Sequence, residues 1–210
     1  MALQYKPTRM ELSNLKKRRT VAIRGHKMMK DKRDELVRRF IILARRNKAL
    51  RLETEQKLAA AMQSFVLARA VMSNNEIEEA LQYPAREITV NAQKQSILSV
   101  PVPKLSLETQ EGFVYPYGFA TTSADLDGAV QSLAEILPLL LELAEVEKAT
   151  SRLADEIEKT RRRVNALEYV MIPQFDEAIH AIQMKLEENE RGNTSRLMKT
   201  KEMLAKEDAS

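Results

Sequence analysis

A hydrophobic repeat of seven residues in the N-terminal third of the chain constrains its fold more than any other feature. Apolar side chains return at every seventh position from residue 15 to residue 50, and no proline interrupts residues 8–81. The repeat consists of Leu15, Ala22, Met29, Leu36, Leu43 and Leu50. In an α-helix this period forms one apolar stripe, which a second helix must cover. We therefore predict one unbroken helix over residues 8–81, about 110 Å long, that forms half of an antiparallel coiled coil.

The stripe of this predicted helix is imperfect. Alternate seam positions carry polar side chains, among them Arg19, His26 and Arg33, and the spacing from Leu50 to Leu58 is eight residues instead of seven. Polar seam positions weaken a coiled coil, and a change of spacing locally unwinds it. We expect an under-filled coiled coil that is less supercoiled near its middle.

A second apolar repeat predicts the partner helix. It begins at Leu126, continues to Leu186 and lies within residues 125–210. The two helical runs have similar lengths, as antiparallel partners require. Pro138 and Pro173 each remove one intrahelical hydrogen bond, so we expect a mild bend at each.

Folding the chain back between the two runs predicts which residues face each other. If Leu81 lies beside Leu126, residue i faces residue 207 minus i. His26 then lies near His180, and we interpret both as ordinary seam residues because no second type of metal ligand accompanies them at a suitable spacing. The register also gathers five arginines into a belt, which either is solvated or meets acidic groups of another protein. The belt consists of Arg45, Arg46, Arg161, Arg162 and Arg163.

Residues 83–124 differ from the helical runs on either side. They contain four of the seven prolines and five of the ten aromatic residues. Residues 88–90 and 97–102 have the β-branched composition of strands, so we predict a two-stranded edge hairpin followed by an aromatic-rich loop. An isolated hairpin is marginally stable, so it should lean on the helix pair or on another subunit. The predicted fold is all-α, with shaft helices at 1–82 and 125–210 and the hairpin insert at the turn end.

Charge is distributed unevenly along the chain. Residues 1–51 contain 17 Lys and Arg against 4 Asp and Glu, whereas the whole chain carries a formal net charge of only +4. A basic helix suggests nucleic acid as a possible partner. However, no aromatic residue lies among the cations between Lys6 and Arg39, which argues against binding to single-stranded nucleic acid by stacking on its bases. A coiled-coil scaffold protein is the other alternative.

The sequence lacks the motifs that are typical of an enzyme active site. There is no cysteine, no glycine-rich loop before a lysine, and no metal-ligand spacing around the two histidines. We therefore predict no catalytic residue, no cofactor and no metal. No run of eighteen apolar residues and no signal segment is present, so we expect a cytoplasmic protein that does not insert directly into the membrane.

Two stretches of sequence are more specific. The first begins with Pro7-Thr8-Arg9 and continues at residues 25–36 as GHKMMKDKRDEL, and the second is RRVNALEYVMIP at residues 162–173. They lie in order on the two predicted helices. Both resemble the signatures of the D subunit of the V-type and A-type rotary ATPases.

The resemblance implies a central rotor shaft without catalytic activity of its own. In that family the paired helices pass through a headpiece of three catalytic A and three non-catalytic B subunits. The small F subunit of the stalk binds the shaft, and a funnel-shaped stalk subunit joins it to the membrane ring of ion carriers. The residues after Leu197 would then form the tip bearing.

The expected contacts follow from the resemblance together with the exposed charge. We predict that flexible cations contact the stationary headpiece, namely Arg9, Lys16, Arg19, Arg24, Lys27, Arg45, Arg46, Arg161 and Arg162. For the insert we predict contact with the F subunit or regulation of the ATPase, with a mere cap on the coil end as the alternative. The insert residues concerned are Ile88, Val90, Phe113, Tyr115 and Tyr117.

Overall fold

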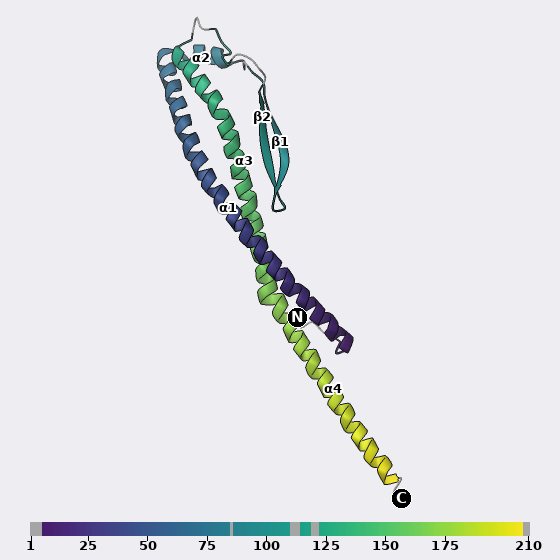
Figure 1. Cartoon of the computed structure of the whole chain (residues 1–210). Coiled ribbons are helices and arrows are strands. Elements are labelled where there is room, and N and C mark those ends of the chain that lie inside the picture. The colour runs from purple at the N-terminus through teal and green to yellow at the C-terminus, as the bar shows by residue number, and fades with distance from the viewer. Residues whose placement is uncertain (1–5, 85, 110–113, 119–121, 208–210) are drawn as a thin grey trace. The chain divides into compact units, whose positions relative to one another are not determined.

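The computed structural model describes residues 6–84, 86–109, 114–118 and 122–207. Its elements are, in chain order, α1 (Arg9–Val71), α2 (Asn74–Leu81), β1 (Ile88–Ile97), β2 (Val100–Thr109), α3 (Ala124–Ala166), the π-helical segment η1 (Leu167–Met171) and α4 (Ile172–Glu207) (Figure 1). The prediction of long helices with a small antiparallel hairpin between them is confirmed. The chain divides into two compact units, one of residues 1–34 with 158–210 and one of residues 35–157.

Helix α1 runs antiparallel to the C-terminal half of the chain within each unit. Residue numbers rise along α1 while those of its partners fall. In the first unit the facing pairs include Arg9 with Glu190 and His26 with Glu168; in the second, Leu36 and Leu153 share one buried cluster, and Ala68 and Leu126 share another. The antiparallel pairing that the two repeats predicted is therefore confirmed.

The predicted unbroken helix over residues 8–81 is wrong in its last part. Helix α1 ends at Val71, and the separate helix α2 follows. Ser73 caps α2, since its Oγ accepts a hydrogen bond from the backbone N–H of Glu76 at 3.3 Å, while Glu76 Oε2 accepts one from the N–H of Ser73 at 2.8 Å. This reciprocal capping box starts a new helix with its own direction, so the long repeat does not continue past Met72.

The break at Ser73 also overturns the predicted register. In two facing pairs the residue numbers add up to 194 instead of the expected 207: Ala68 with Leu126, and His26 with Glu168. Because α2 takes up residues 74–81, α1 meets α3 earlier in its own sequence than Leu81. His26 consequently faces Glu168 instead of His180.

The predicted arginine belt depended on that register and is wrong as well. Arg46 forms an ion pair with Glu142, and Arg162 forms one with Glu158 of its own helix. Arg46 and Arg162 also belong to different units of the chain.

The hairpin packs along the helix pair of the unit 35–157. Val100 and Val102 of β2 are buried in one cluster with Leu36 of α1 and with Ala149 and Leu153 of α3. Figure 1 shows the two strands running beside α3. The expectation that the hairpin leans on the helices is therefore confirmed, and its tip reaches away from the turn end where it begins.

The turn of the hairpin lies inside a segment that the sequence predicted to be a strand. Ile97 pairs with Val100, and Leu98 and Ser99 between them have positive φ angles of 51° and 70°. Two successive left-handed residues are typical of a type I′ turn, whose twist matches that of paired strands. Residues 97–102 thus contain the reversal instead of one continuous strand.

Pro138 and Pro173 affect the helices differently. Pro138 lies inside α3, which continues through it. Pro173 follows the π-helical turn η1, in which the N–H of Ile172 donates to the carbonyl of Leu167, five residues earlier. The sequence predicted only a mild bend at Pro173, and the structure places a locally widened helix just before it.

Candidate functional site

The described residues contain no group of three or more histidines or carboxylates placed to hold a metal ion. Nor is any helix among them long and apolar enough to cross a membrane. The candidate sites are therefore surfaces: the exposed cations along the helices, the π-helical turn η1, and the hairpin with the loop that follows it.

Near the start of α1, two of the predicted contact cations are engaged within the chain. Arg9 pairs with Glu190 at 2.6 Å, and Arg19 pairs with Asp176. Both pairs bridge α1 and α4, and the Arg9 side chain is still 82% exposed. An exposed pair of this kind contributes about 0–1 kcal/mol, so it can be exchanged for another partner at small cost.

Three further predicted cations in this first part of α1 have no such partner. Lys16, Arg24 and Lys27 are exposed, and none of them forms an ion pair within the part of the chain that the structure describes. By helical spacing Arg24 lies opposite the stripe of the buried Leu15 and Ala22, while Lys16 and Lys27 flank that far side of the helix. The helix thus presents a basic outer face that the described part of the chain does not fully neutralise.

The remaining predicted cations are exposed but differ in their partners. Arg46 bonds to Glu142 across the helix pair, and Arg162 bonds to Glu158 one turn away. Arg45 and Arg161 form no ion pair among the described residues.

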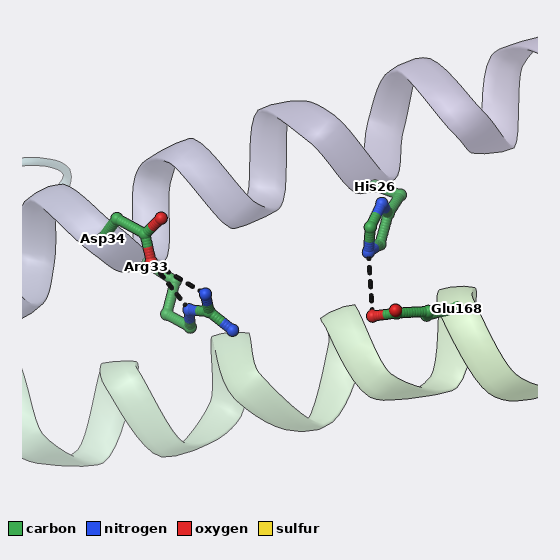
Figure 2. A network of polar contacts seen from close by, with 4 residues as sticks. All are labelled: His26, Arg33, Asp34 and Glu168. Carbon is green, nitrogen blue, oxygen red and sulfur yellow. Dashed lines mark hydrogen bonds and ion pairs between the residues drawn. The ribbon is translucent and has the colours of Figure 1, made fainter.

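A polar contact that the sequence did not reveal joins α1 to the π-helical turn. Figure 2 shows the side chains of His26 and Glu168 directed toward each other, with His26 Nε2 and Glu168 Oε2 3.2 Å apart. In the same view the guanidinium of Arg33 donates to Asp34, the next residue in the chain. The His26 contact becomes an ion pair only when the imidazole is protonated.

The π-helical turn also exposes an apolar surface. Tyr169, Val170 and Met171 are 71%, 49% and 43% exposed. All three belong to the second sequence signature. Periodicity could not single them out, because a change from α- to π-helical winding alters which residues face outward.

The predicted contact residues of the insert differ in their exposure to solvent. Ile88 and Val90 on β1 are about half exposed. Tyr117 instead packs against the buried cluster of Ala68, Met72, Ile77 and Leu126. Burial, together with the nearby carboxylate of Asp127, raises the pKa of Tyr117.

The loop after the hairpin is anchored by its tyrosines. Tyr115 Oη donates a hydrogen bond to Gln131 Oε1 at 3.1 Å, and its ring lies 6.1 Å from that of Tyr117. Phe113, the remaining predicted contact residue, lies outside the described residues.

Ile88 lines an apolar groove at the base of the hairpin. The groove has a volume of about 350 Å³, and its walls come from the end of α2, the start of the hairpin, the loop and α3. Apolar lining residues include Leu81, Tyr83, Leu107, Val130 and Leu137. A surface groove of this composition is suited to receive an apolar side chain from another protein.

Comparison with known proteins matches the whole chain to one family. The family model that describes the D subunit of ATP synthase matches residues 11–202. The V-type ATP synthase D subunit of Clostridium novyi (strain NT) is 56% identical over 99% of this chain and 98% of its own length. The corresponding proteins of Clostridium botulinum (strain Langeland) and of Thermoanaerobacter sp. (strain X514) are 55% and 54% identical. They cover 100% and 97% of this chain, and 99% and 98% of their own lengths. The chain, with its antiparallel helices and hairpin insert, therefore belongs to the family of the V-type ATP synthase D subunit.

Proposed function

We propose that this protein is the non-catalytic central rotor subunit of a V-type ATPase. It transmits torque between ATP turnover in a headpiece of three A and three B subunits and ion transport in a membrane ring. In this role it binds the small F subunit and the funnel-shaped subunit of the stalk, and it stays peripheral to the membrane. The observation that carries the proposal is an antiparallel helix pair in a chain of the D-subunit family. Several of its outward cations, among them Lys16, Arg24 and Lys27, form no ion pair within the described residues.

Exposed cations are suited to a shaft that turns against a stationary ring. Lys16, Arg24 and Lys27 can attract acidic groups over several ångströms without forming a buried bond. Each exposed ion pair contributes about 0–1 kcal/mol. A contact of that strength can break and re-form at each step, whereas a buried pair would hold the shaft at one angle.

The two-helix construction also supplies asymmetry. A pair of antiparallel helices has no three-fold axis, so it presents a different surface to each of three equivalent headpiece sites. Contacts that differ among the sites favour a different nucleotide state at each of them. This is how a shaft without a catalytic group can act on catalysis elsewhere.

For the insert we propose binding to the F subunit or regulation of the ATPase. The exposed Ile88 and Val90 and the apolar groove beside Ile88 support this proposal, because exposed apolar surface favours association. Deletion of residues 87–107 tests it. Loss of the F subunit or a changed rate of ATP hydrolysis is expected, whereas a complete complex of unchanged rate would leave the insert as a cap on the coil end.

The composition of the native complex tests the rotor proposal directly. This chain, tagged within the acidic middle of its sequence, should purify with one copy of itself per three A and three B subunits, together with the F subunit. Native mass spectrometry measures these ratios. A bare homodimer would instead support a coiled-coil scaffold, and a complex with nucleic acid would support a basic binding helix.

The cationic contacts require their own test. In the assembled complex, the double change Arg161→Gln and Arg162→Gln should lower the ATPase rate about two- to tenfold, since each exposed contact is worth up to about 1 kcal/mol. The matched control is Lys57→Gln with Arg69→Gln, which removes the same charge outside the predicted contacts. Equal rates for the two double variants and the unaltered complex would refute this role of the arginines.

A further inference from the structure

A second groove lies between the hairpin and α3, within the unit 35–157. It has a volume of about 440 Å³. Figure 1 shows β1 and β2 beside α3 along this stretch. The lining residues are Ala92, Gln93 and Lys94 of β1, Pro101, Val102 and Pro103 of β2, and Lys148 and Arg152 of α3.

The groove gathers positive charge in an otherwise acidic part of the chain. Residues 82–150 contain only four Lys and Arg against nine Asp and Glu, yet two of those four cations, Lys94 and Lys148, line it, and Arg152 joins them. None of the three forms an ion pair within the described residues. Like charges held near one another without counter-charges repel, so an anionic ligand would be attracted to all three.

The acidic side chains shortly before Lys148 are engaged elsewhere, and Asp155 and Glu156, shortly after Arg152, form no ion pair with it among the described residues. Glu145 accepts a hydrogen bond from the backbone N–H of Leu105 at 2.9 Å, and Glu147 lies 3.9 Å from Arg51 on the other helix. No carboxylate is among the residues that line the groove. Its charge is therefore available to a partner.

The walls indicate the chemical class of that partner. Pro101 and Pro103 lack backbone N–H groups, so this part of β2 cannot form the cradle of amide donors that commonly binds free phosphate. The walls are largely apolar, and Val102 is almost fully buried at their base. Apolar walls with cations around them are complementary to a peptide that carries both carboxylates and apolar side chains.

We propose that this groove binds an acidic, amphipathic peptide segment of a partner protein. Lys94, Lys148 and Arg152 pair with its carboxylates, while Pro101 and Pro103 contact its apolar side chains. The inference goes beyond the proposed rotor role and does not depend on it, because the groove is complete within one unit of this chain.

Binding to the purified full-length chain tests the proposal. The ligand is a fluorescein-labelled peptide of alternating glutamate and leucine, and binding is followed by fluorescence anisotropy. The triple change Lys94→Gln, Lys148→Gln and Arg152→Gln should weaken binding about tenfold, as expected when three exposed ion pairs are lost. The control, Lys48→Gln with Lys57→Gln and Arg69→Gln, removes equal charge elsewhere and should bind as the unaltered chain does.

Two competitors identify what the groove recognises. A peptide with serine in place of leucine should bind several-fold more weakly, because it cannot use the apolar walls. Sodium triphosphate should not displace the labelled peptide at equal concentration. Displacement by triphosphate, equal binding of the serine peptide, equal weakening in the control variant, or no peptide binding at all would each overturn the proposal.

Discussion

Replacing Leu153 with alanine should loosen the hairpin as well as weaken the helix pair. Leu153 is fully buried, and it shares its cluster with Leu36 of α1 and with Val100 and Val102 of β2. The two valines are themselves 5% and 4% exposed. The leucine therefore lies where two helices and one strand meet, and its truncation leaves a cavity that all three border.

The expected size of the effect follows from this packing. Truncation of a buried leucine to alanine costs about 2–5 kcal/mol of stability, depending on how far the neighbours collapse into the cavity. A two-stranded hairpin is marginal by itself, so its order depends on the contacts of Val100 and Val102 with the helices. If about 1.4 kcal/mol of the loss falls on hairpin docking, amide exchange in β2 should accelerate about tenfold.

Two measurements separate the two effects. Urea unfolding followed by circular dichroism gives the change in the free energy of unfolding, and hydrogen exchange with mass spectrometry gives the opening of residues 97–107. Leu197→Ala is the control, because this leucine is 70% exposed and its truncation should change stability by no more than about 0.5 kcal/mol. A clear loss of stability with unchanged exchange in β2 would refute the idea that this cluster holds the hairpin.

Further predictions concern the cap of α2 and the backbone of β2. Ser73→Ala should destabilise α2 by about 1 kcal/mol, measured as faster amide exchange in residues 74–81. The hydrogen bonds from Ser73 lower the pKa of Glu76. The contribution of the Glu76 carboxylate to the stability of α2 is therefore fully present above the ordinary pKa of a glutamate and is lost as pH falls through the lowered pKa. NMR titration of Glu76 should show the lowered pKa, and Glu76→Gln should abolish this pH dependence of the stability of α2. Glu145→Ala leaves the N–H of Leu105 without its acceptor, so it should lower the free energy of unfolding, measured in urea, by about 1–3 kcal/mol. Glu147→Ala removes only an exposed ion pair and should lower it by less than about 1 kcal/mol. A larger loss for Glu147→Ala than for Glu145→Ala would contradict the assignment of Glu145 as the acceptor.

The repeat in the sequence predicts which helix faces are buried, and the structure agrees. Leu15, Ala22 and Leu36 are buried as the seven-residue period requires. The repeat does not determine which turn of one helix meets which turn of the other. The residue numbers of two facing pairs, Ala68 with Leu126 and His26 with Glu168, add up to 194 instead of 207. The difference is close to two heptads, so the same stripes remain in contact after the shift. Periodicity alone therefore cannot distinguish the two registers.

The register is instead decided by the connection between the helices. Ser73 and Glu76 have the spacing of a capping box, and this local signal ends the long repeat and directs residues 74–81 into a separate helix. Ion pairs between the helices depend on the register and could not be predicted without it. Exposure of Lys16 and Lys27 followed from the stripe, whereas the partners Glu190 of Arg9 and Asp176 of Arg19 did not.

Pro173 shows why a missing hydrogen bond has consequences at a distance along the helix. Proline has no N–H to offer the carbonyl of Tyr169, four residues earlier, and simple reasoning predicts a bend at that point. The chain instead widens over the preceding residues, where the N–H of Ile172 reaches back five residues to Leu167. That π-helical turn is the element that carries Glu168, the partner of His26. The position of Glu168 beside α1 is thus a property of the widened turn, which explains why neither the repeat nor the residue types could predict the contact.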